Sequence, residues 1–160
     1  MPDAYSLSRN TTEGFARRVR KNLAFIVKKR NEGEDVHEVT QLVTSLLGLI
    51  IFPWEAGALQ HLESLPLSEL EAEGWPGWDI QLDDKGDTKS LGKLTGHLRN
   101  AACHRRLKFS SEHREMHKVE IEFEDAANKK SPPNWRAKIN AADLAVFCER
   151  FTKRLEGLVG

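Results

Sequence analysis

The sequence predicts a mainly α protein, a helical bundle with a small β-hairpin before the C-terminal helix. Apolar residues recur at the three-and-four spacing of an amphipathic helix in several segments. Two neighbouring segments instead alternate apolar and charged residues, as strands do, directly before the last helical segment. With 160 residues and 39% apolar content, the chain is long enough for one core. We therefore expect a single domain over residues 1–160, with residues 1–10 flexible.

Two helices are predicted in the first third of the chain. The first begins at Thr11 or Thr12 and ends at Gly33, with apolar side chains on one face and basic side chains on the other. The second runs from about Asp35 until Pro53 stops it. Its second half is apolar on all sides, which indicates a central, buried helix.

The middle of the chain, residues 54–87, combines short helical pieces with a loop. The stretch WEAGALQHLESLPLSELEAEGW predicts one or two short helices, and GWPGWDIQLDDKGD predicts a loop with a brief strand. Trp75 and Trp78 lie in this loop with no aromatic-rich strand beside them. We therefore expect them to anchor packing rather than to stack on nucleobases.

The stretch LTGHLRNAACHRRLKF belongs to a helix that is predicted to begin near Asp87 or Thr88. Its leucines and alanines form one apolar stripe, which directs the remaining face outward or across an interface. On that helix His97, Asn100 and His104 follow one another at i, i+3 and i+7, and so form one polar stripe.

The β-hairpin is predicted from KVEIEFED and NWRAKIN, which a turn-rich linker joins. Apolar residues alternate with glutamates in the first segment and with Arg136 and Lys138 in the second. Acids of one strand should therefore face bases of the other. The final helix follows directly, with Asn140 as its N-cap.

Charge is balanced overall but separated along the chain. The formal net charge is zero, so an anionic substrate must be held by a local patch rather than by a global field. Residues 88–111 contain six Lys or Arg and no acid, whereas residues 63–87 contain eight acids and one Lys. This pattern predicts either two complementary surfaces or a basic site beside an acidic flap.

Several classes of protein are excluded by what the sequence lacks. No basic flank with an apolar run opens the chain, and the longest apolar stretch, LLGLIIF, is far below the ~20 residues that span a bilayer. Cys103 and Cys148 form no disulfide framework, so we expect a cytoplasmic protein with no membrane partner. No glycine-rich phosphate loop and no HExxH motif is present.

A zinc site is a weaker alternative. Cys103, His104, His113 and His117 could be combined into a ligand set, but one cysteine provides no paired spacing and adjacent ligands seldom converge. We therefore expect no metal and no cofactor.

Arg99, Asn100 and His104 suit the cleavage of an RNA phosphodiester bond. The bare R-x4-H spacing is common by chance, and five residues place the arginine ~140° around a helix from the histidine. A histidine can transfer a proton at neutral pH, and an arginine binds a phosphate with two hydrogen bonds as its charge builds up. The asparagine can orient either partner. The 2′-hydroxyl is an internal nucleophile, so a metal is unnecessary.

The sequence HLRNAACH resembles the motif of the HEPN superfamily, which is R-x4-6-H with Asn, Asp or His usually following the arginine. VTQLVTSLLGLIIFPWE resembles the central helix of one bacterial, often plasmid-borne branch of HEPN nucleases. The motif helix, the hairpin and the W…I…DL…F pattern that leads into the last helix are similar to that branch as well. The resemblance covers about residues 15–157.

The resemblance implies a compact α-helical bundle that forms a homodimer. In the superfamily the motif helices of two subunits meet in one composite cleft, which cuts single-stranded RNA without metal in toxins and phage-defence proteins. Carried over to this sequence, the catalytic residues are Arg99, Asn100 and His104. Three neighbours outside the motif are expected to contact RNA phosphates: His97, Arg105 and Arg106.

A second interpretation stays open beside the endoribonuclease. Some HEPN domains are inactive and serve as interaction or nucleotide-binding modules, usually with a broken motif, whereas the motif here is intact. In toxins of the superfamily that are silenced by adenylylation, a tyrosine follows two places after the histidine. Here Arg106 occupies that place and Tyr5 is the only tyrosine, which puts control by that modification in doubt. An antitoxin or other regulatory protein is a further expected partner.

Overall fold

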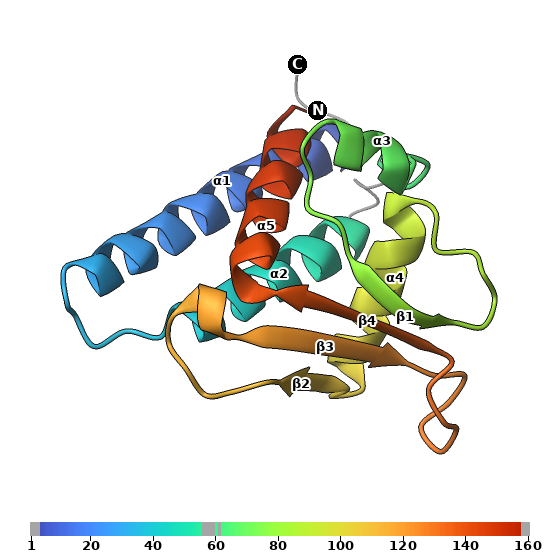
Figure 1. The fold of residues 1–160 in the computed structure, drawn as a ribbon. Helices are drawn as coiled ribbons and strands as arrows, with labels where there is room; N and C mark the ends of the chain where they lie inside the picture. Colours follow the sequence, from blue (N-terminus) through green and yellow to red (C-terminus); the bar gives the residue numbers. More distant parts are fainter. Residues whose placement is uncertain (1–3, 56–59, 61, 158–160) are drawn as a thin grey trace.

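The computed structural model describes residues 4–55, 60 and 62–157. Their elements are, in chain order, α1 (Ala4–Asn31), α2 (Glu38–Glu55), α3 (Leu67–Ala72), β1 (Asp79–Asp83), α4 (Leu91–Cys103), β2 (Leu107–Phe109), the 3-10 helix η1 (Met116–Lys118), β3 (Glu120–Asp125), β4 (Trp135–Asn140) and α5 (Ala141–Glu156). Figure 1 shows the longer helices α1, α2 and α5 gathered on one side and the strands on the other. The mainly α architecture is as the sequence predicts.

The first two helices extend beyond their predicted bounds. Helix α1 begins at Ala4 rather than at Thr11 or Thr12; Thr12 is fully buried, so it packs in the interior instead of capping a helix. Helix α2 continues to Glu55, so the prediction that Pro53 stops it was wrong. So close to a helix end, a proline removes a single helical hydrogen bond. The predicted flexibility of residues 1–10 falls partly outside the described residues and stays a prediction.

The predicted hairpin is the centre of a four-stranded antiparallel sheet in the order β1-β4-β3-β2. Strand β1 is the brief strand expected in the glycine-rich loop. Strand β2 was not predicted, because its residues were assigned to the end of the motif helix. Of the short helical pieces expected in residues 54–75, α3 is one, and residues 56–59 and 61 lie outside the described part of the chain.

The two faces of the hairpin differ as the alternation predicts. On the outer face Glu122 pairs with Lys138 at 3.6 Å, and Glu124 pairs with Arg136 at 3.1 Å. The opposite face carries fully or nearly fully buried apolar residues: Ile121, Phe123, Trp135, Ala137 and Ile139. This inner face packs on the helices, α4 among them (Figure 1).

Trp75 and Trp78 anchor packing, as expected. Both rings make edge-on contacts with Phe147 of α5, at centroid distances of 5.4 and 5.5 Å. Trp78 also contacts Phe123 of β3 at 5.6 Å. The loop that contains them therefore joins α5 to the sheet.

Within residues 4–55, 60 and 62–157, no helix has both the length and the apolar character that crossing a bilayer requires.

Candidate active site

Helix α4 carries most of the predicted site, and its sequence determines where it begins and which face it buries. Ser90 is its N-cap, and the Oγ atom accepts a hydrogen bond from the backbone N–H of Lys93 at 3.3 Å. The predicted apolar stripe is confirmed, since four residues of the helix are at most 1% exposed: Leu91, Leu94, Leu98 and Ala101. Burial of this stripe determines which residues the other faces present.

The acidic segment of the chain lies directly against the start of α4. The backbone N–H groups of Leu91 and Gly92 donate to the carbonyl oxygens of Leu65 and Glu63, at 2.8 and 3.0 Å. A Cβ atom on Gly92 would lie 2.8 Å from the carbonyl oxygen of Glu63, so only glycine permits this approach.

A pocket of about 460 Å³ lies between the acidic segment and α4. His97 and Asn100 line it from the helix, and Glu63, Lys85 and Asp87 are among its other lining residues. Lys93 pairs with Asp87 at 3.2 Å. Both interpretations of the charge pattern therefore apply in part: the acidic and basic segments are paired, and the acidic one borders the pocket.

His97 and Asn100 converge on one buried carboxylate, Asp125 at the end of β3. The Nδ1 atom of His97 lies 2.8 Å from Asp125 Oδ2, and the Nδ2 atom of Asn100 donates to the same oxygen at 3.1 Å. The other carboxylate oxygen, Oδ1, accepts the N–H of Ala126 at 2.8 Å. Asp125 is only 6% exposed, and these bonds offset the cost of burying its charge.

Trp135 forms the floor beneath His97. The two rings are stacked, with centroids 4.5 Å apart and planes 5° from parallel. The indole is itself held, because its Nε1–H donates to the hydroxyl of Thr88 at 3.0 Å. His97 is thereby constrained in its plane by the carboxylate and on one face by the indole.

His104 lies where α4 ends, so the prediction that the helix continues towards residue 109 was wrong. His104 is the C-cap, and Arg105 adopts a left-handed conformation with a φ of 56°. The N–H groups of Arg105 and Arg106 donate to the carbonyl oxygens of Ala102 and Ala101, at 3.1 and 2.8 Å. This is the Schellman arrangement, which usually has glycine where Arg105 stands. The chain then turns into β2, and His104 is exposed and is not among the residues that line the pocket of His97 and Asn100.

The remaining basic residues of the site differ in their surroundings. Arg105 is exposed and Arg99 is partly buried. The guanidinium of Arg106 donates to the backbone carbonyls of Asn128 and Lys129, at 3.3 and 3.1 Å. Arg106 therefore supports the linker between β3 and β4 in addition to any contact with a ligand.

Comparison with known families identifies the chain. The sequence profile of the family HEPN pEK499 p136 matches residues 1–157. The chain belongs to this HEPN family. Neither a curated protein nor a solved structure matches it. In this HEPN protein the R-x4-H motif thus begins within α4, at Arg99, and ends at the C-cap of that helix, at His104.

The residues of the weaker zinc alternative are divided among separate segments of the HEPN chain. Cys103 is exposed at the end of α4, His113 lies in the connector after β2, and His117 lies in η1. In the part of the chain that the structure describes, no group of three or more His, Cys, Asp or Glu residues is placed to hold a metal ion.

Asp125 and Trp135 are site residues that sequence reasoning missed. Both were included only as part of the two strands of the predicted hairpin. Yet the alternation that places Ile121 and Phe123 on the inner face also places Asp125 there. A buried carboxylate needs hydrogen-bond donors. The inward position of Asp125 could therefore have predicted that β3 packs against a helix with donor side chains.

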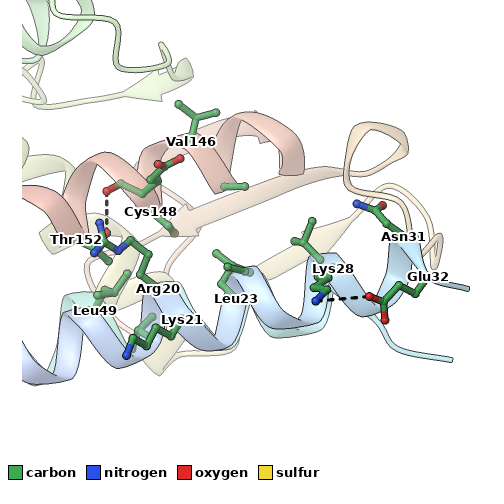
Figure 2. A pocket seen from close by; sticks show the side chains of 15 residues that line it. Arg20, Lys21, Leu23, Lys28, Asn31, Glu32, Leu49, Val146, Cys148 and Thr152 are labelled. Atoms are coloured by element: carbon green, nitrogen blue, oxygen red, sulfur yellow. Dashed lines mark hydrogen bonds and ion pairs between the residues drawn. The ribbon is translucent and has the colours of Figure 1, made fainter. Parts of the chain in front are cut away.

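A second hollow of the HEPN protein, of about 800 Å³, lies between α1 and α5. Figure 2 shows it with Leu23 of α1 and Val146 and Cys148 of α5 among its labelled side chains. Lys21 and Lys28 also line it, and Lys28 pairs with Glu32 at 3.8 Å. The groove is largely apolar and lacks convergent groups for chemistry.

Proposed function

We propose that this HEPN protein is a metal-independent endoribonuclease that cleaves single-stranded RNA, in a toxin or phage-defence role. The observation that carries the proposal is the intact Arg99–Asn100–His104 motif, with Asn100 held by Asp125 at 3.1 Å on the wall of a pocket. Neighbouring Arg105, which is exposed, supplies positive charge for a phosphate backbone.

Each motif residue has a role that its chemistry supports. Arg99 binds the scissile phosphate with its planar pair of N–H donors and stabilises the charge that develops on it. Asn100 orients a reacting group, since Asp125 holds one end of its side chain. His104, exposed at the end of the helix, transfers a proton. The 2′-hydroxyl attacks the adjacent phosphorus, so the products carry a 2′,3′-cyclic phosphate and a 5′-hydroxyl.

The proposed enzyme is a homodimer. His104 stands apart from the pocket that His97 and Asn100 line, so one chain provides a divided site. Two copies that meet along α4 would bring the end of one helix to the pocket of the other. Light scattering should therefore report a dimer, and a monomer at high concentration would count against this arrangement.

The test is RNA cleavage in the presence of EDTA by the wild type, by His104→Ala and by the control His117→Ala. His117 is an exposed histidine in η1, outside the site. We expect the wild type and the control to cleave and to leave 2′,3′-cyclic phosphate ends, and His104→Ala to lose activity by ~10²-fold or more. If wild type and His104→Ala are equally inert on every RNA tried, the enzyme is excluded.

The second candidate is a non-catalytic interaction module, which the groove between α1 and α5 favours. Its occupant would be an amphipathic helix of a regulatory protein, with an apolar face for Leu23 and Val146 and acidic flanks for Lys21 and Lys28. Binding of such a partner should be lost in Leu23→Glu and unaffected in His104→Ala. A chain that binds in this way and cleaves no RNA would support the second candidate.

A further inference from the structure

His97 meets more of the requirements for directed proton transfer than any other histidine whose contacts the structure describes. Its ring is hydrogen-bonded through Nδ1 to Asp125 and stacked on Trp135. Its side chain is 16% exposed and borders the pocket of about 460 Å³. Yet His97 lies outside the R-x4-H motif, which begins only at Arg99.

The hydrogen bonds around Asp125 determine which nitrogen of His97 carries the proton. When Asp125 is ionised, its carboxylate only accepts hydrogen bonds, and Nδ1 of His97 is then the donor. The amide of Asn100 donates to the same oxygen, and the N–H of Ala126 occupies the other. In the neutral ring the second nitrogen, Nε2, is then an unprotonated base.

The surroundings of Nε2 leave it open to a ligand. No hydrogen bond joins it to any of the residues that the structure describes, although His97 lines the pocket. If Nε2 takes a proton, the new imidazolium is stabilised by the carboxylate of Asp125 in the plane of the ring. The indole face of Trp135, 4.5 Å away, stabilises the same cation.

We propose that His97 is the general base of the ribonuclease reaction and that Asp125 is its positioning residue. This assignment rests on the proposed function. The Nε2 atom of His97 takes the proton of the 2′-hydroxyl, and the 2′-oxygen forms a bond to phosphorus. The bond from phosphorus to the 5′-oxygen breaks, and that oxygen takes a proton from the protonated ring of His104 of the second copy in the proposed dimer. Asp125 stays ionised throughout and also holds Asn100.

The two histidine roles can be separated with a pair of RNA substrates. One is an ordinary RNA with a mapped cleavage site, and the other carries sulfur in place of the 5′-oxygen at that bond. A thiolate leaves without being protonated, so the second RNA needs a base but no acid. We expect His97→Gln to lower kcat by ~10²-fold or more on both RNAs. His104→Ala should be impaired on the ordinary RNA and approach the wild-type rate on the sulfur RNA.

The variants are chosen to preserve the fold. The side-chain amide that His97→Gln introduces can still donate to Asp125, and circular dichroism verifies the structure. Asp125→Asn converts one acceptor of the cluster into a donor, so it should lower kcat without a comparable change in KM. Glu122→Gln, on the outer face of the same strand, is the matched control and should cleave at the wild-type rate.

A second measurement tests directly whether Asp125 positions the ring of His97. In ¹⁵N NMR spectra of the imidazoles at neutral pH, His97 should be the Nδ1–H tautomer in the wild type and should lose that preference in Asp125→Asn. An Nε2–H tautomer in the wild type would overturn the inference.

The kinetic outcomes distinguish a failure of the role of His97 from a failure of the proposed ribonuclease function. A wild type that cleaves both RNAs while His97→Gln matches it would overturn the role of His97 and leave the proposed function standing. A recovery of His97→Gln on the sulfur RNA, without recovery of His104→Ala, would reverse the two roles and also overturn the inference. A wild type that is inert on both RNAs would remove the proposed function and, with it, the catalytic role of His97.

Discussion

Asp125 and Trp135 are directly paired across strands β3 and β4, and both reach the same ring, that of His97 on α4. The carboxylate bonds the edge of the imidazole and the indole covers one face. Because cross-strand partners have their Cβ atoms only ~4.5–5.5 Å apart, one residue pair of a hairpin can fix a histidine in two directions. The sheet therefore positions the His97 side chain, in addition to packing against the helices.

Arg99→Lys should lose most of the RNA cleavage activity while the fold persists. Lysine keeps the positive charge but lacks the planar pair of donors that binds two phosphate oxygens together. We expect a loss of ~10²-fold in kcat, comparable to removing one donor to a developing charge. Cleavage assays with circular dichroism as the folding control measure this effect. Full activity in the variant would show that the arginine does not bond the phosphate as proposed.

Arg105→Gly should stabilise the protein and weaken RNA binding. Arg105 has a φ of 56°, which costs a residue with a side chain ~1–2 kcal/mol, whereas glycine adopts it freely. We expect the free energy of unfolding in urea to rise by about 1 kcal/mol. Arg105→Lys, which keeps the strain and the charge, is the control and should change neither property. A less stable Arg105→Gly variant would refute the role of the left-handed turn.

Gly92→Ala and Gly96→Ala should have opposite effects on the stability of the monomer. A Cβ atom on Gly92 would meet the carbonyl oxygen of Glu63 at 2.8 Å, so the segment must shift, at a cost of ~1–3 kcal/mol. A Cβ atom on Gly96 would meet nothing within 4 Å, and alanine favours a helix over glycine by up to ~1 kcal/mol.

Thermal unfolding of both variants measures this contrast. Equal destabilisation would contradict the close approach at Gly92. The second variant also tests the dimer, since Gly96 lines the pocket face of α4. If two copies meet there, Gly96→Ala should lower the dimer affinity in light scattering while the monomer gains stability.

Glu124→Gln should make the protein less sensitive to acid. The hydrogen bond from Lys108 is the main cause that holds the pKa of Glu124 below its ordinary value of 4.5, and Arg136 adds to it. A lowered folded pKa means that the stabilisation is present above the unfolded pKa and is lost as the pH falls through the folded pKa. The wild type should therefore lose stability below about pH 4.5, and the variant, already weaker at neutral pH, should lose less.

Urea unfolding at neutral and acidic pH tests this prediction. Glu120→Gln is the matched control, because Glu120 lies on the same strand but is exposed, with Lys138 3.7 Å away. Its unfolding should follow the acid dependence of the wild type. Identical slopes for Glu124→Gln and the wild type would show that the carboxylate of Glu124 does not contribute.

Local patterns predicted the elements whose structure depends on one segment alone. The buried stripe of α4, the N-cap at Asn140 and the pairing of acids with bases on the outer face of the hairpin all follow from periodicity and capping chemistry. The same reasoning failed where a residue departs from its usual preference. Arg105 adopts the left-handed conformation that usually requires glycine. No residue in HRRLKF therefore predicted the end of α4 or the start of β2.

Sequence patterns alone identify a mainly α HEPN protein with an intact R-x4-H motif on an amphipathic helix. The packing of the folded chain places His97 against the carboxylate of Asp125, which the sequence did not predict. His97 and Asp125 are 28 residues apart in the chain. Alternation shows on which face of a strand a residue lies, but it does not show which helix packs against that face. That choice depends on the packing of every apolar stripe at once, and this packing placed β3 against α4.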